Sequence, residues 1–258
     1  MGALGEWDVD QYEKFKAERS QPFYDLLSMV EPREGLYCID LGCGSGELTR
    51  ELHRRLLAKE TVGLDSSDSM LAKARTFSGE GLTFRTGSIE QFDESDRYDL
   101  VFSNAALQWV PNHEALFEGL SRALRRKGQL AIQIPSNRDH PSQAVAFELE
   151  NEEPYRGLAR SRVEENVLTL EEYAVLLDRF GFERVNLRMQ IYLHHLPSRN
   201  EVLEWVKGTF LLDYKKALKP EQFNRFLADY RERLMEKLKD SRPHLFTFKR
   251  ILMHATKD

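Results

Sequence analysis

The sequence predicts an α/β fold: a doubly wound, mostly parallel sheet of seven strands, with a helical lid inserted near the C-terminal strands. Short apolar runs alternate with helix-like segments over residues 1–135, and this alternation is typical of parallel strands joined by helices. The central runs are almost continuously apolar, as expected of strands that helices cover on both faces. At 258 residues the chain is long enough for one such domain with an elaboration.

The elements of the first half follow in order from the N-terminal region. Residues 8–30 carry large apolar side chains at helical spacing, and Pro22 suits the first turn of a second helix there. The predicted strands are then 37–41, 61–64, 82–86, 98–103 and 129–134, and the helices between them are 47–57, 67–76 and 115–124.

The pattern changes after Pro135. Residues 136–166 are polar and predict a loop with a short helix, whereas Thr169 and Glu172 form a capping-box pattern for a helix that Gly181 stops. A strand at 183–196, helices at 198–210 and 219–239, and a last strand at 246–255 complete the prediction. The expected units are a cofactor-binding core with N-terminal helices at 1–135, a connecting segment with the sixth strand at 136–197, a helical substrate lid at 198–245 and a final strand at 246–258.

Residues 40–46 (DLGCGSG) join the first predicted strand to the first helix after it. Glycines allow the unusual backbone angles of such a turn, and the first N–H groups of the helix face a ligand there. A dinucleotide fingerprint has its third glycine one position later, where this chain has Glu47, whose carboxylate would repel a pyrophosphate. The carboxylate of Asp40 suits a ligand with an amino group and a positive sulfur. The segment therefore resembles motif I of class I S-adenosylmethionine-dependent methyltransferases, with Asp40, Gly42, Cys43, Gly44 and Gly46 as candidate cofactor-binding residues.

Further candidates follow the second strand. In an open α/β sheet the ligand lies beyond the carboxyl ends of the strands, so residues at successive strand ends are expected to meet. Asp65 follows about 20 residues after the glycines, as a ribose-binding carboxylate would, although it also suits the cap of the next helix. Ser66 lies beside it, and Met70 suits either a cover for the adenine or the core.

The third and fourth strand ends complete the expected cofactor site. Ser88 stands where methyltransferases of this type usually have an aspartate for the adenine amino group, which leaves part of that contact to the backbone of Ile89. Asn104 offers a donor and an acceptor near the methionine end of the cofactor, next to Ala105. Trp109 offers an aromatic face near a sulfonium or a planar acceptor, or packs against the lid.

A closer resemblance is to the trans-aconitate 2-methyltransferase group. Residues 18–22 (ERSQP) and 104–113 (NAALQWVPNH) carry it most specifically, and further matching segments are Trp7, Asp8 and Tyr12, then 40–46, 63–67, 192–198 and 204–206. The resemblance implies that S-adenosyl-L-methionine donates a methyl group to a carboxylate oxygen and that a monomethyl ester forms. A carboxylic acid is already ionised at pH 7, so no catalytic base is expected.

The resemblance also implies residues that bind the acceptor. Arg19 is the first candidate for orienting an acid, with Tyr12 and Trp109 beside it. His194 matches a family histidine but equally suits the core, and His195 points to the opposite face of the strand.

The predicted lid departs from the family pattern. The family has Gly-Leu-Arg-Pro where this chain has residues 210–213 (FLLD), so Leu212 replaces an arginine that would bind a carboxylate. With Phe210 before it and Asp213 after it, Leu212 suits an acid with fewer carboxylates and more apolar surface.

Composition narrows the partners. The formal net charge of -5 does not favour nucleic acid, and no apolar run approaches the length of about 18 residues that spans a membrane. The start of the sequence has neither a basic region nor an apolar signal core, which indicates a cytoplasmic protein. Cys38 and Cys43 show no disulfide or metal-ligand spacing. The oligomeric state stays open, with a monomer favoured.

Two other functions remain open, and a third is disfavoured. The enzyme could methylate a nitrogen or carbon of a small metabolite, which would need a base or a dry aromatic pocket. The domain could also bind the cofactor as a regulatory module without catalysis. A nicotinamide dehydrogenase is disfavoured by Asp40 and Glu47.

Overall fold

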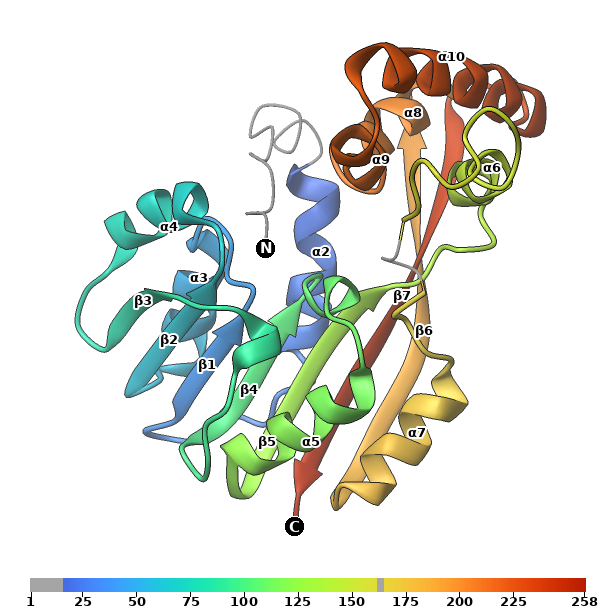
Figure 1. Ribbon diagram of the computed structural model, residues 1–258. Coiled ribbons are helices and arrows are strands. Elements are labelled where there is room, and N and C mark those ends of the chain that lie inside the picture. Colours follow the sequence, from blue (N-terminus) through green and yellow to red (C-terminus); the bar gives the residue numbers. More distant parts are fainter. Residues whose placement is uncertain (1–15, 162–164) are drawn as a thin grey trace.

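The computed structural model describes residues 16–161 and 165–258 (Figure 1). A seven-stranded sheet in the order β3-β2-β1-β4-β5-β7-β6 forms its centre. The neighbours from β3 to β5 pair in parallel, and β7 is antiparallel to both β5 and β6. The predicted α/β fold with a mostly parallel sheet is therefore confirmed.

The strand bounds agree closely with the sequence prediction. Residues 37–41 and 82–86 match it, and the last strand extends beyond 246–255 at both ends. The strands are β1 (Tyr37–Leu41), β2 (Glu60–Asp65), β3 (Leu82–Thr86), β4 (Tyr98–Asn104), β5 (Leu124–Pro135), β6 (Phe182–Leu196) and β7 (His244–Lys257).

Helices cover both faces of the sheet, as the apolar central strands require. The helices are α2 (Lys16–Leu27), α3 (Glu47–Leu56), α4 (Asp68–Ala74), α5 (His113–Ala123), α6 (Pro141–Leu149), α7 (Leu170–Arg179), α8 (Asn200–Lys207), α9 (Leu212–Ala217) and α10 (Pro220–Lys237). Helix α2 packs on one face through Phe23 and Leu26, in a cluster with Phe102 and Ala131. Helices α5 and α7 supply residues to the apolar cluster on the other face.

The predicted capping box of α7 is present. The side chain of Thr169 accepts from the backbone of Glu172, whose carboxylate in turn accepts from the backbone of Thr169. Gly181 follows with a φ of 76° and ends the helix. Only glycine adopts this left-handed conformation at little energetic cost.

Pro22 does not begin a second helix. Helix α2 runs from Lys16 through Pro22 to Leu27 without a break, so the prediction of a helix start at Pro22 is wrong. The buried side chains of Phe23, Leu26 and Leu27 follow the proline directly. Because they anchor the last turns of α2 to the sheet, tertiary packing offsets the backbone hydrogen bond that a proline removes.

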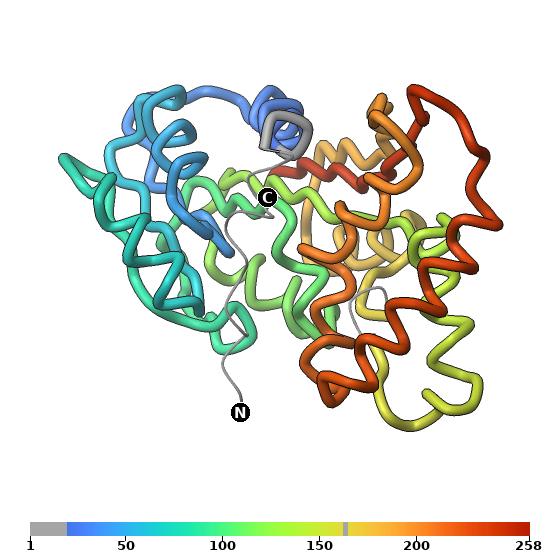
Figure 2. The backbone as a smooth tube through the Cα atoms, turned by 90° about the horizontal axis from the view of Figure 1, so that it is seen from above, coloured from blue at the N-terminus to red at the C-terminus, as the bar shows by residue number. Residues whose placement is uncertain are grey.

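The helices between β6 and β7 (α8, α9 and α10) form a second unit with α6 and residues 150–161, which precede α7 in the chain; we call this unit the helical cluster. It stands beyond the carboxyl ends of the parallel strands, on the side of β6 and β7 and opposite α3 and α4 (Figures 1 and 2). Its core contains Leu149 and Tyr155 together with Trp205, Phe226 and Phe246. The segment from α6 to residue 161 therefore packs with the helices of the predicted lid, and α9 is an additional helix.

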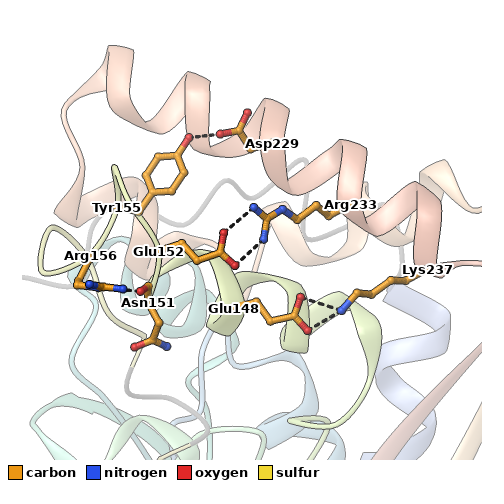
Figure 3. A network of polar contacts seen from close by, with 8 residues as sticks. All are labelled: Glu148, Asn151, Glu152, Tyr155, Arg156, Asp229, Arg233 and Lys237. Carbon is orange, nitrogen blue, oxygen red and sulfur yellow. Dashed lines mark hydrogen bonds and ion pairs between the residues drawn. The ribbon is translucent and has the colours of Figure 1, made fainter.

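Polar contacts also tie α6 and the residues after it to α10. Arg233 of α10 donates to both carboxylate oxygens of Glu152, at 2.9 and 2.7 Å (Figure 3). Lys237 bonds Glu148 in the same way, and the hydroxyl of Tyr155 donates to Asp229. Together with the shared core, these contacts hold the helical cluster together. Within the described residues, no helix combines the length and the apolar character needed to cross a membrane.

Candidate functional site

The three glycines of the turn after β1 differ in what requires them. Gly42 and Gly46 have φ angles of 79° and 78°, and a Cβ at either position would collide with its neighbours, Ala106 and Ala74 respectively. Gly44 also has a positive φ, 53°, but a Cβ there would meet none of the described residues within 4 Å. Packing therefore requires Gly42 and Gly46, whereas Gly44 borders open space in which a ligand can approach the backbone.

Asp65 at the end of β2 holds this turn in place. Its Oδ2 accepts a hydrogen bond from Gly44 N at 2.8 Å, and its Oδ1 accepts from Ser67 N at 2.9 Å. Ser67, not Asp65 or Ser66, is the N-cap of α4, because its side chain accepts from Met70 N. Met70 is half-buried and Ser66 is exposed. Each carboxylate oxygen of Asp65 keeps a further lone pair, so ribose hydroxyls can still bind it.

Asp40 lies beneath the turn. Only 4% of Asp40 is exposed, and its Oδ2 accepts from the hydroxyl of Thr49 on α3 at 2.6 Å. Burial raises the pKa of Asp40 to about 7, partly offset by the bond from Thr49. Cys38 and Cys43 are buried free thiols, and burial raises the pKa of both. Asp40 therefore contacts α3, and we infer that it supports the turn from below.

The end of β4 carries a buried acceptor. Among the described residues, Oδ1 of Asn104 is buried and has no hydrogen-bond partner. The next residue, Ala105, has a φ of 57°, which is a strained angle for any residue other than glycine. Its backbone N donates to Gln133 O. A strained turn beside an unsatisfied acceptor is typical of a ligand site. The acceptor and the open space at Gly44 fit a cofactor with an ammonium group.

The remaining cofactor candidates surround the same edge of the sheet. Ser88 caps the short helix Ile89–Gln91, since its hydroxyl accepts from Glu90 N at 3.2 Å. Ile89 is half-buried and points at Gly42, 3.7 Å from the position of a Cβ there. Trp109 ends the short helix Leu107–Trp109 and is half-buried. The structure thus brings these residues to the strand ends at which the sequence places them.

The acceptor-binding candidates are less uniformly placed. Tyr12 lies outside the described residues, and Arg19 is described only as part of the backbone of α2. His194 is buried in the helical cluster with its ring centroid 4.9 Å from that of Trp205, whereas His195 is exposed, as opposite faces of a strand require. Phe210 and Leu212 are both buried, at 5% and 7% exposed. Their contact with an acceptor stays a prediction.

Sequence reasoning missed two polar residues at this edge. Arg250 on β7 is 4% exposed and donates from Nη1 to Oε1 of Gln133 on β5, at 3.1 Å. Its guanidinium lies 4.8 Å from the ring centroid of Phe248 and 5.9 Å from that of Tyr192. The available signal was a glutamine in the apolar run 130–134 (LAIQI) and an arginine in 246–253 (FTFKRILM). Buried polar residues in central strands need hydrogen-bond partners, so a polar residue within an apolar run indicates a buried contact or a ligand site.

Comparison with known proteins identifies the family. Residues 32–181 match a family model described as a methyltransferase domain. A trans-aconitate 2-methyltransferase from Deinococcus radiodurans is 38% identical over 256 residues, which cover 97% of this chain and 98% of that protein. The chain belongs to the trans-aconitate 2-methyltransferase family. It is an S-adenosylmethionine-dependent methyltransferase.

Solved structures agree with this fold. The YcgJ protein from Bacillus subtilis superimposes with a TM-score of 0.64 at 15% identity, over 91% of this chain and 97% of that chain. Phosphoethanolamine N-methyltransferase 2 from Haemonchus contortus, in complex with S-adenosyl-L-methionine, superimposes with a TM-score of 0.57 at 16% identity. That match covers 92% of this chain and 52% of that chain.

Proposed function

We propose that this enzyme transfers the methyl group of S-adenosyl-L-methionine to a carboxylate oxygen of a small carboxylic acid, forming a monomethyl ester. The observation that carries the proposal is the match to a trans-aconitate 2-methyltransferase over 97% of the chain. That match includes the helical cluster as well as the sheet, so it extends to the part of the molecule in which acceptor specificity is expected.

The reaction requires the protein to bind the cofactor and the acceptor, to orient them relative to each other and to exclude water from the site. When bound, the cofactor supplies a methyl group on a positive sulfur, which one carboxylate oxygen takes as the carbon–sulfur bond breaks. Asn104 Oδ1 would accept a hydrogen bond from the cofactor's ammonium, Asp65 would accept from the ribose, and the space at Gly44 would admit the ligand to the backbone. The acceptor is already ionised at neutral pH, so no residue needs to remove a proton. Alignment of the reacting atoms then provides the main acceleration.

The acceptor we propose has fewer carboxylates than trans-aconitate, or is trans-aconitate itself at reduced efficiency. Leu212 stands where the family pattern has an arginine, and the neighbouring Asp213 accepts from Ser161 Oγ at 3.2 Å. An acidic neighbour disfavours a third carboxylate at this place. Arg19, Tyr12, Trp109, His194 and Phe210 remain the proposed acceptor-binding residues beside Leu212.

The proposed setting follows from the composition. A net charge of -5 disfavours a nucleic-acid partner, and we propose a cytoplasmic monomer that acts on small molecules away from membranes.

Methyl transfer from labelled S-adenosylmethionine to a panel of mono-, di- and tricarboxylic acids tests this function. We expect an alkali-labile methyl ester from at least one acid, and faster turnover of dicarboxylates than of tricarboxylates. The variant Asn104→Leu, which lacks the ammonium acceptor, measures the background. Cofactor binding without ester formation from any acid would contradict the proposal and would favour a nitrogen or carbon acceptor.

A further inference from the structure

Two glutamines on β5 bond two residues on β7 in the same diagonal arrangement. Gln129 pairs in register with Thr256 but bonds His254, and Gln133 pairs with Leu252 but bonds Arg250. Both glutamines are 0% exposed. Side chains alternate between the faces of a strand, so both pairs lie on the same face of the sheet, toward α2. The pairs differ in which end of β5 they occupy.

The pair at the amino end of β5 is complete. Gln129 Oε1 accepts from Glu31 N at 2.7 Å and from His254 Nε2 at 2.9 Å, and Gln129 Nε2 donates to Glu31 O at 2.9 Å. The loop after α2 therefore satisfies both ends of this amide. A buried amide with partners at both ends has a structural role.

The pair at the carboxyl end is incomplete. An arginine has donors only, so its bond fixes Oε1 of Gln133 toward Arg250 and leaves Nε2 as the free end of the amide. Within the described part of the chain, Gln133 Nε2 is buried and has no acceptor. A buried donor without an acceptor is costly, and in a native protein it marks a bound water or a ligand.

The position of this donor points to a ligand. Gln133 is the register partner of Asn104 on β4, so their side chains point to the same face of the sheet. Among the residues that the structure describes, Asn104 has a buried acceptor and Gln133 a buried donor without a partner, and the two do not bond each other. The acceptor suits the cofactor's ammonium, and the donor suits an anion beside it.

We propose that Gln133 Nε2 and Arg250 bind a carboxylate of the methyl acceptor that does not itself react, and that the acceptor is therefore at least a dicarboxylate. This inference rests on the proposed function and specifies its acceptor. A cation beside an N–H donor is a strong carboxylate site. An oxygen paired with a guanidinium is a poor nucleophile, so the anchored carboxylate is distinct from the methylated one.

Aromatic rings surround part of the Arg250 guanidinium. The guanidinium lies over the rings of Phe248 and Tyr192, and the hydroxyl of Tyr192 donates to Asp25 Oδ2 on α2 at 2.7 Å. Rings from β6 and β7 thus position the cation, and α2 in turn holds the ring from β6. Fixing the cation in advance reduces the ordering cost of binding.

The test compares Gln133→Glu with the matched control Gln129→Glu, which makes the same change on the same strand face. Succinate and succinamate, which differ by one carboxylate, are used as acceptors and, in the presence of S-adenosylhomocysteine, as ligands in calorimetry. For Gln133→Glu we expect the KM and Kd for succinate to rise about 10–100-fold. We expect the values for succinamate and the cofactor Kd to change by less than about threefold.

Kinetics are measured at a temperature at which circular dichroism shows each variant to be folded. Arg250→Lys, which keeps the charge but loses the planar fork, is expected to weaken succinate binding in the same selective way. Unchanged succinate binding in folded Gln133→Glu and Arg250→Lys would overturn the inference, and an ordered water would then satisfy Gln133. If wild-type enzyme methylated no acid but bound succinate through these residues, the proposed function would fail while the carboxylate site stood.

Discussion

The two ends of β5 present the same residue type with opposite outcomes. At the amino end, Gln129 is saturated by His254 and by the backbone of Glu31. At the carboxyl end, Gln133 bonds Arg250 through its oxygen and keeps an unsatisfied nitrogen within the described residues. The same face of one strand therefore carries one glutamine with a structural role and one that is a candidate for binding a ligand.

The difference shows how a buried polar residue is to be interpreted. Both glutamines are fully buried, so burial does not distinguish them. They differ only in whether each polar atom of the amide has a hydrogen-bond partner. The incomplete group lies at the carboxyl ends of the strands, where ligands bind in open α/β sheets. Asn104 follows the same rule on the neighbouring strand, whereas Ser103, one residue earlier, is satisfied by Leu41 O at 2.8 Å.

The largest expected effect is on stability at the amino end. Gln129→Glu removes the donor to Glu31 O and buries a carboxylate against that carbonyl, which should lower the free energy of unfolding by about 3–5 kcal/mol. Gln133→Glu keeps an acceptor for Arg250 and should change it by less than about 1 kcal/mol. Urea denaturation measures both values. Equal destabilisation by the two variants would break the comparison.

Asp65 tests whether a group at the carboxyl end that already has hydrogen-bond partners can also bind ligand. Asp65→Ala removes the acceptors of Gly44 N and Ser67 N and the proposed ribose contact. Cofactor affinity should fall by about 2–3 kcal/mol, as calorimetry would show. Asp65→Asn keeps one acceptor oxygen and should lose less. An unchanged affinity in Asp65→Ala would reduce this residue to a support of the turn.

Asn104 sharpens the comparison between neighbours. Asn104→Leu removes the unsatisfied acceptor and should weaken cofactor binding by about 1.5–2 kcal/mol with little loss of stability. The control Ser103→Ala breaks a satisfied buried bond and should lower stability while it leaves the cofactor Kd unchanged. If Ser103→Ala weakened cofactor binding more than Asn104→Leu, missing hydrogen-bond partners would not identify the groups that bind a ligand.

The smallest expected effect concerns pH. Burial lowers the pKa of His254, so the unfolded chain binds its proton more readily than the folded one. The stabilisation is fully present above the unfolded pKa of about 6.5 and is lost as the pH falls below it. His254→Gln should therefore reduce the loss of stability between pH 7 and pH 5 by about 1 kcal/mol or less. An unchanged pH profile in denaturant melts would contradict a lowered pKa of His254 in the folded chain.

Much of the fold could be predicted from the sequence because its signals are local. The apolar run 37–41 and the glycine turn after it define β1 and α3, and the capping box at Thr169 and Glu172 defines the start of α7. The strand ends at Asp65 and Asn104 were also predictable, since parallel strands bring their carboxyl ends to one edge. Pro22 is the exception, because packing of α2 on the sheet outweighs a local rule.

The residues that were missed depend on contacts between distant parts of the chain. Gln133 and Arg250 are 117 positions apart, and only the antiparallel placement of β7 beside β5 brings them together. The helical cluster likewise joins the segment after α6 to α10 through Glu152 and Arg233, a pairing that no local pattern encodes. Surface charges at such positions look like ordinary solvated residues until the fold is known.

A crystal structure of the enzyme with S-adenosylhomocysteine and succinate tests the central claim most directly. The account predicts the cofactor's amino group at Asn104 Oδ1 and one succinate carboxylate within hydrogen-bond distance of Gln133 Nε2 and the Arg250 guanidinium. The other carboxylate should face the sulfur. Succinate bound elsewhere, with an ordered water at Gln133 Nε2, would contradict the account.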